Sequence, residues 1–310
     1  MNGRHRRCRL PVPSLLCLLE TRMKQYIVLY NPLSQTGNGL ESAKKIEAYL
    51  PDAEVRYQDM TQIESAAAFL QETPAEVGLA FTGGDGTLNR VLNALDGVGL
   101  DREIFYFPAG SGNDFVNDLH IGKDCGLIAI NPYRKYLPKI LVNGESYRFI
   151  NGTGHGFDGW CCAEKERLHA LGKSKAYTMI AFEGLMLGKY KPTNAKISVD
   201  GVEKSYKQVW MAPVMFGEYC GGGVKMGPGQ DRNNPEHTVT SVVIHDVNRV
   251  KALILFLFVT KGEGKRFPKY IEYRTGKNVK LEFDRAVPLQ IDGEVIPDVV
   301  GYEVQTAGEE

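Results

Sequence analysis

Glycine and aspartate are concentrated in the run Phe81-Thr82-Gly83-Gly84-Asp85-Gly86-Thr87-Leu88-Asn89, which follows an apolar segment and opens a helical pattern. In such a loop, backbone N–H groups and the helix N-terminus converge on one point, an arrangement that binds phosphate. Asp85 would repel a phosphate unless it tethers the loop backbone or acts through Mg²⁺. The alternative is an ordinary strand-to-helix turn with aspartate as its N-cap.

Two further loops have the same setting. The first, Asn31-Pro32-Leu33-Ser34, follows an apolar strand and leads into a helical pattern. The second, Pro108-Ala109-Gly110-Ser111-Gly112-Asn113-Asp114, follows another apolar strand and also leads into a helical pattern. Parallel strands end at the same edge of a sheet, which is where open α/β sheets bind ligands. We therefore expect the three loops to form one polar rim, although either of these two could be only a turn.

Two carboxylates stand close to the end of the chain, in Asp292-Gly293-Glu294. In an extended chain a spacing of two residues puts both side chains on one face, and Gly293 leaves room for a substrate. This pattern predicts a general base for the proton of an attacking hydroxyl. The alternative is a hairpin turn with solvated acids, which is common for an Asp-Gly pair.

The segments that must position these residues show two different sequence patterns, one in each half of the chain. From Lys24 to about Asn143, apolar strands alternate with helical periodicity, which predicts an α/β domain with a parallel sheet. After Gly144 come short alternating strands, which predict an all-β domain with helical insertions at 184–187 and 251–258. Asp200-Gly201 predicts a type I′ hairpin turn within that domain.

The first 22 residues are basic and then apolar, but prolines interrupt them and no small-residue cleavage site follows, so we expect an unstructured leader before Met23. The longest apolar run, at 252–259, is far shorter than the roughly 20 residues that span a bilayer. Lys261, Lys265, Arg266 and Lys269 follow it, and this combination is typical of contact with an anionic membrane. A buried helix followed by a solvated loop is the alternative.

The composition narrows the class of protein. The chain has 310 residues, which favours two domains, and 37 Lys and Arg balance 37 Asp and Glu. This balance argues against nucleic acid as the main partner. Six cysteines without a CxxC pair and six scattered histidines give no support for zinc, and they fit buried thiols in a reducing cytoplasm.

Taken in order, the motifs resemble the soluble diacylglycerol kinase catalytic family of lipid kinases, which also includes sphingosine and ceramide kinases. The matching segments are Asn31-Pro32, GGDGT at 83–87, PAGSGNDF at 108–115, GTGHGFDG at 152–159, GGGVKMGP at 221–228 and QIDGE at 290–294. NAD kinases share the GGDGT loop and phosphofructokinases have a similar one. The later motifs therefore carry the likeness to lipid kinases.

The resemblance implies an N-terminal phosphofructokinase-like α/β domain at 23–143 and a C-terminal β-sandwich at 144–298, with residues 299–310 returning to the first domain. It implies that Mg²⁺-ATP binds in the cleft between the domains. The implied nucleotide contacts are Asn31, Pro32, Gly83, Gly84, Asp85, Gly86, Thr87, Leu88, Asn89, Ser111 and Asn113. The implied catalytic carboxylates are Glu294, as proton acceptor, and Asp292. The implied carboxylate and water network around Mg²⁺ is Asp85, Asp114 and Asp158.

This sequence departs from the family pattern at the position of a structural Mg²⁺ site. Where the family carries Asp-Gly as part of that site, this chain has Asn234-Pro235. An amide oxygen binds a hard cation more weakly than a carboxylate does. Asp231 is the substitute ligand that we expect if this site persists.

The sequence thus predicts an ATP-dependent lipid kinase that phosphorylates the hydroxyl of diacylglycerol or a similar lipid. Its partners would be ATP, the lipid substrate and, transiently, the membrane surface, and a homodimer is compatible with the sequence. We expect a cytoplasmic protein in peripheral contact with the membrane. The alternatives are an NAD kinase-like kinase of a soluble substrate and a catalytically silent regulator that binds nucleotide or lipid.

Overall fold

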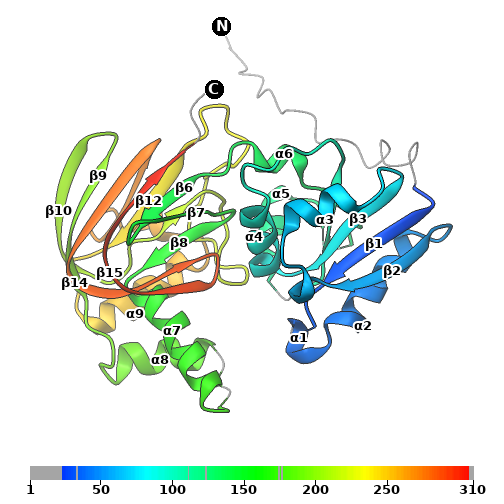
Figure 1. The fold of residues 1–310 in the computed structure, drawn as a ribbon. Helices are drawn as coiled ribbons and strands as arrows, with labels where there is room; N and C mark the ends of the chain where they lie inside the picture. Colours follow the sequence, from blue (N-terminus) through cyan, green and yellow to red (C-terminus); the bar gives the residue numbers. More distant parts are fainter. Residues whose placement is uncertain are drawn as a thin grey trace, which may run out of the picture.

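The computed structural model describes residues 23–306 except Leu33, Ser111, Lys123, Ser174 and Ala176. The predicted leader and Ser111 therefore lie outside the described residues. The chain forms an α/β part and a β part that lie side by side, with α4 and α5 of the first part facing the second (Figure 1).

The α/β part is built on a sheet with the strand order β2-β1-β3-β4-β5, in which all neighbours are parallel except β4 and β5. β3 and β4 are almost continuously apolar because helices cover both faces of a parallel sheet, and Phe81 and Tyr106 are fully buried. Its elements are β1 (Gln25–Tyr30), α1 (Ser34–Gly37), α2 (Gly39–Lys44), η2 (Lys45–Tyr49), β2 (Glu54–Asp59), η3 (Met60–Gln62), α3 (Ala66–Glu72), β3 (Val77–Gly83), α4 (Asp85–Ala94), β4 (Ile104–Pro108), α5 (Asp114–Leu119), β5 (Ile128–Ala129) and α6 (Asn131–Arg134).

The β part is a larger antiparallel sheet with the order β13-β12-β11-β8-β14-β15-β6-β7, and the hairpin β9–β10 is attached to β14. The long strand β14 pairs with β9 along its first half and with β8 at its end, so it joins both halves of the sheet. The elements are β6 (Lys139–Val142), β7 (Glu145–Arg148), β8 (Gly152–His155), α7 (Phe157–Ala170), α8 (Tyr177–Met186), β9 (Thr193–Val199), β10 (Val202–Val209), β11 (Val214–Met215), β12 (Val239–Ile244), α9 (Arg249–Val259), η4 (Gly264–Arg266), β13 (Ile271–Gly276), β14 (Asn278–Ile291) and β15 (Glu294–Gln305).

The predicted fold class, a parallel α/β domain followed by an all-β domain, is confirmed. Helices also lie at both predicted insertions, as α8 and α9. The hairpin turn at Asp200-Gly201 is present, with φ angles of 48° and 81°. Among the described residues, no helix is both long enough and apolar enough to cross a membrane.

The strand pairing differs from the predicted domain limits at two places. β6, which we placed in the first domain, pairs with β7 and β15 in the larger sheet. β15 stays in that sheet through Gln305, so residues 299–305 add no strand to the smaller one. The missed signal is Asn143-Gly144, whose positive φ angles form the tight turn of the β6–β7 hairpin. We propose to divide the chain between β5 and β6.

The two parts share one hydrophobic core. A single cluster of buried side chains contains Leu88 and Phe115 from the α/β part and Phe149 and Leu289 from the β part. A junction packed in this way holds loops from both parts in fixed positions. The candidate site lies at this junction.

Candidate functional site

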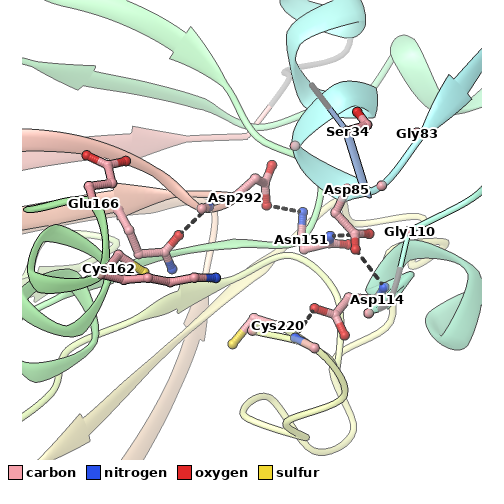
Figure 2. Close-up of a pocket in the computed structure, with 18 of the residues that line it drawn as sticks. Ser34, Gly83, Asp85, Gly110, Asp114, Asn151, Cys162, Glu166, Cys220 and Asp292 are labelled. Carbon is pink, nitrogen blue, oxygen red and sulfur yellow. Dashed lines mark hydrogen bonds between the residues drawn. The ribbon is translucent and has the colours of Figure 1, made fainter. Parts of the chain in front are cut away.

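A pocket of about 650 Å³ opens between the two parts. Figure 2 shows Gly83, Asp85 and Gly110 on one side of it, and Asp292, Cys162 and Glu166 on the other. The loops after β1, β3 and β4 all contribute lining residues, as expected for strand ends at one sheet edge. The remaining walls come from the start of β8, from α7, from the glycine loop at 220–222 and from the β14–β15 turn.

The glycines of this pocket let neighbouring loops touch. A Cβ atom on Gly110 would lie 2.5 Å from the Cα atom of Gly84, and one on Gly112 would lie 2.9 Å from the Cα atom of Gly222. Real Cβ atoms are not found this close to backbone, so alanine at either position would push the loops apart. The glycines therefore fix the width of the pocket and also leave its backbone open to a ligand.

Asp85 holds two of the loops together. Its carboxylate accepts hydrogen bonds from the backbone N–H groups of Asp114 and Phe115, at the start of α5, and from the amide of Asn151 (Figure 2). A carboxylate at this position also interacts favourably with the dipole of α5. Of the two roles predicted for Asp85, the contacts show the tether.

Asp114 connects the β4 loop with the β part. Its carboxylate accepts from the N–H groups of Gly222 and Gly223, which both adopt positive φ angles that favour glycine. Burial raises the pKa of Asp114 to about 6, and the charge of Asp85 adds to this effect, while the two N–H groups oppose it. The site thus holds negative charge that a bound cation would stabilise.

Asp292 connects the end of β14 with both parts of the molecule. It accepts hydrogen bonds from the backbone of Ile150, Asn151 and Gly152 and from the side chain of Asn89. The residue keeps some exposed surface, but these four donors surround its carboxylate. Burial raises the pKa of Asp292 to about 6, against the effect of the three backbone donors.

The expectation that Asp292 and Glu294 share one face of an extended chain is wrong. Asp292 and Gly293 form a two-residue turn, with φ angles of 46° and 96°, and Ile291 pairs with Glu294 across it. A type I′ turn reverses the chain, so the spacing of two does not apply. Asp292 points inward, whereas Glu294 begins β15 and forms an ion pair with Arg90 of α4 at 2.8 Å.

The predicted nucleotide contacts separate into two groups. Gly83, Gly84, Asp85 and Gly86 line the pocket, whereas Asn31, Pro32, Thr87, Asn89 and Asn113 are not among its lining residues. The side chain of Leu88 is fully buried in the shared core, because it faces inward from α4. Asn89 donates to Asp292 and to the carbonyl oxygen of Arg148, so it joins the two parts of the chain.

Of a polar wall on α7, only Asp158 was predicted from the sequence, and the other residues were missed. Asp158, Cys162, Lys165, Glu166 and His169 all line the pocket. Positions 158, 162, 165 and 169 follow one another at steps of three or four residues and 166 adjoins 165, so all five lie on one face of the helix, a signal that was present in the sequence. The Asp158 carboxylate accepts a hydrogen bond from Gln290 at 2.9 Å.

The predicted structural metal site is not formed. Asp231 accepts from the N–H of Asn233, and Asn234 accepts from the N–H of Glu236, so both oxygens close local turns. Among the residues that the structure describes, no group of three or more His, Cys, Asp or Glu side chains could hold a metal ion. The donor set therefore does not fit a structural Mg²⁺.

Arg232 supplies a positive charge next to Asp231, where the structural metal site was predicted. Its guanidinium pairs with Asp118 of α5 and donates to Ile150 and Asn151, and both charged side chains are almost fully buried. An arginine can satisfy several oxygen acceptors at once. This ion pair links the α/β part to the β part without a metal.

We therefore expect divalent cations to contribute nothing to the folding of this region. EDTA should leave the Tm of the protein without nucleotide unchanged, and Asp231→Ala should lower the free energy of unfolding by less than about 1 kcal/mol, as is usual for an exposed residue. Thermal unfolding with and without EDTA checks both. A fall in Tm with EDTA in wild type but not in Asp231→Ala would show that Asp231 does hold a structural cation.

The chain is thus a two-part protein in which a mainly parallel sheet with glycine loops at one edge packs against an antiparallel β domain. Two family profiles match the chain: the diacylglycerol kinase catalytic domain at residues 25–135, and the YegS C-terminal NAD kinase beta sandwich-like domain at residues 153–305. The chain belongs to the diacylglycerol kinase family of kinases.

Relatives in this family match along most of their length. A diacylglycerol kinase of Bacillus subtilis (strain 168) is 25% identical over 285 residues, which is 88% of this chain and 90% of the relative. A diacylglycerol kinase of Staphylococcus carnosus (strain TM300) is 24% identical and covers 87% of this chain and 89% of the relative. The crystal structure of a diacylglycerol kinase from Bacillus anthracis str. Sterne has a TM-score of 0.58 at 18% identity, over 92% of this chain and 93% of that one, which shows the shared fold.

Proposed function

We propose that the protein transfers the γ-phosphate of ATP to the hydroxyl group of diacylglycerol or a similar lipid. The observation that carries this proposal is the convergence, on one pocket, of three strand-end loops and the carboxylates of Asp85, Asp114 and Asp158. Phosphoryl transfer depends mainly on positioning and charge stabilisation, which such a pocket supplies. Membership of the diacylglycerol kinase family supports the lipid acceptor.

The phosphates of ATP would lie on the loop at Gly83–Gly86. Three glycines leave the backbone N–H groups there open, and the N-terminus of α4 follows directly. Lys165, Lys173 and Lys175 line the opposite wall, where their charges would balance those of the transferred phosphate. Nucleotide and acceptor would thus meet between the α4 loop and α7.

Mg²⁺ fits this pocket as a companion of the nucleotide. Mg²⁺ in kinase sites is held by one or two carboxylates together with phosphate oxygens. The described residues contain no preformed group of three such ligands, so one or two of the carboxylates of Asp85, Asp114 and Asp158 would hold the ion together with phosphate oxygens. Burial, and to a smaller extent the charge of Asp85, raises the pKa of Asp114, and a cation would favour the charged form. When bound, the ion would neutralise charge on the phosphates.

Glu294 is the proposed proton acceptor for the lipid hydroxyl. It lies near the pocket edge, since its Oε1 atom would be 3.8 Å from a Cβ atom on Gly86, a lining residue. Arg90 donates to both of its carboxylate oxygens, in an ion pair that is largely exposed. Asp292 has four hydrogen-bond donors around its carboxylate, so we assign it to the structure of the site.

The proposal is tested with radiolabelled ATP and a panel of diacylglycerol, monoacylglycerol, sphingosine, ceramide and NAD. We expect label in the phosphorylated product of diacylglycerol or of a similar lipid. Label in NADP alone would replace the lipid with a soluble acceptor. ATP binding without transfer to any member of the panel would favour a regulator.

Asp85→Asn should reduce turnover by about 10² to 10³, the usual cost of one preorganised charged contact. An asparagine can accept through one atom only, so its amide group would face a backbone N–H group of α5. Turnover and the ATP Kd are the measurements. Asp59→Asn is the control, because Asp59 also accepts from a backbone N–H group after a strand of the same sheet but does not line the pocket. Equal turnover in wild type and Asp85→Asn would contradict the assignment of this loop.

A further inference from the structure

Two helices of the β part, α8 and α9, are apolar on their outer as well as their inner sides. Their inner residues pack in a core cluster that includes Ile180, Leu185, Ala252 and Leu255. Their outer residues are exposed. We define the apolar face as the six exposed side chains Met179, Phe182 and Met186 of α8 and Val250, Ile254 and Leu257 of α9.

The apolar face is organised and not a scatter of single residues. Its members are spaced by three or four along each helix, so each set forms one stripe, and α8 packs against α9. A helix that is apolar all round is normally buried. Exposed apolar surface of this kind marks a site of interaction.

Positive charge surrounds this face. Residues 173–191, which contain α8, have four lysines and one glutamate, and residues 249–269, which contain α9, have six basic residues and one glutamate. These two segments are therefore basic although the whole chain has no net charge. Apolar side chains flanked by Lys and Arg bind anionic lipid surfaces by insertion and charge attraction together.

We propose that the apolar face docks on an anionic lipid membrane and so places the mouth of the pocket against the bilayer. α7 and α8 project from the lower end of the β part, away from its strands (Figure 1). Lys173 and Lys175 line the pocket and directly precede α8. The membrane surface would therefore meet both the apolar face and the entrance used by the substrate.

The lining of the pocket supports the same arrangement. Among the described residues that line it, none is Leu, Ile, Val, Met, Phe, Tyr or Trp. Acyl chains would therefore find no large apolar side chain inside the pocket. We infer that only the hydroxyl-bearing headgroup enters the pocket, while the acyl chains stay in the bilayer beside α8 and α9. This inference rests on the proposed function.

The test is sedimentation of the full chain with vesicles, in the absence of ATP. We expect wild type to bind phosphatidylglycerol vesicles and to bind phosphatidylcholine vesicles more weakly. Phe182→Asp and Leu257→Asp should each lower the partition coefficient at least about tenfold, comparable to the loss of one buried large side chain. The matched control is Val202→Asp in the β9–β10 hairpin, an apolar residue outside the face that is at least as exposed, and this variant should bind like wild type.

Unchanged vesicle binding by both aspartate variants, or equal binding of wild type to the two vesicle types, would overturn the docking proposal. So would a dimer that the variants convert to monomer without any change in vesicle binding, because the face would then join two copies of the chain. Activity on dissolved dioctanoylglycerol separates the two proposals. Vesicle binding without phosphorylation of any lipid contradicts only the kinase function, whereas phosphorylation of the dissolved lipid without vesicle binding contradicts only the docking.

Discussion

Asp292→Ala is expected to lower the free energy of unfolding by about 3 to 5 kcal/mol, the range for removing one partner from a buried charged network. The substitution leaves three backbone N–H groups and the Asn89 amide without their acceptor. These donors belong to the segment 150–152 and to α4, so the contact between the two parts of the chain should loosen. Activity should fall with it, because the pocket lies at this junction.

Asp298→Ala is the matched control for this substitution. Asp298 also has a positive φ angle, of 54°, but it is exposed. Alanine should therefore carry the same backbone cost at both positions, on the order of 1 kcal/mol. Urea unfolding of both variants measures the difference. Equal destabilisation would show that the backbone conformation matters and that the hydrogen bonds of Asp292 do not.

The effect of Asp292 should also depend on pH. Burial raises its pKa to about 6, above the ordinary value of aspartate, so the folded state binds this proton more tightly than the unfolded chain. The contribution of the group to stability then rises as the pH falls from about 6 to about 4. The difference in unfolding free energy between wild type and Asp292→Ala should widen over that interval. A difference that narrows would mean that the hydrogen bonds outweigh burial.

The fold and the place of the glycine loop at the sheet edge were predictable because their signals are local. Apolar strands separated by helical periodicity identify a parallel sheet, and the glycines of 83–86 mark a loop whose backbone must stay open. The common edge of parallel strands then brings the three loops together without further information. Predicting these features requires only the local geometry of strands, turns and helices.

The roles of the carboxylates were not predictable because they depend on partners distant in sequence. Asp85 meets the start of α5 and Asp292 meets Asn89, about 200 residues away. Nothing in a local window distinguishes such tethers from metal ligands or bases. The same holds for Arg232, whose buried partner Asp118 lies in the other part of the chain.

Substitution of Glu294 can distinguish a general base from a residue that only holds the structure together. Glu294→Gln should lower kcat by about 10² to 10⁴, the usual contribution of a positioned general base, because an amide cannot accept the hydroxyl proton. The ATP Kd should stay nearly unchanged, since Glu294 is not among the residues that line the pocket where the nucleotide would bind. The measurements are kcat with diacylglycerol and an equilibrium Kd for ATP.

Arg90→Gln supplies the control that a single variant lacks. Both substitutions break the ion pair between α4 and β15, but only Glu294→Gln removes the proton acceptor. The pair is largely exposed, so its loss alone should change stability little. If Glu294 is the base, Arg90→Gln should retain most of kcat. If the two variants lose kcat equally, the ion pair matters as a positioning contact, and the proton acceptor must be another group in the pocket.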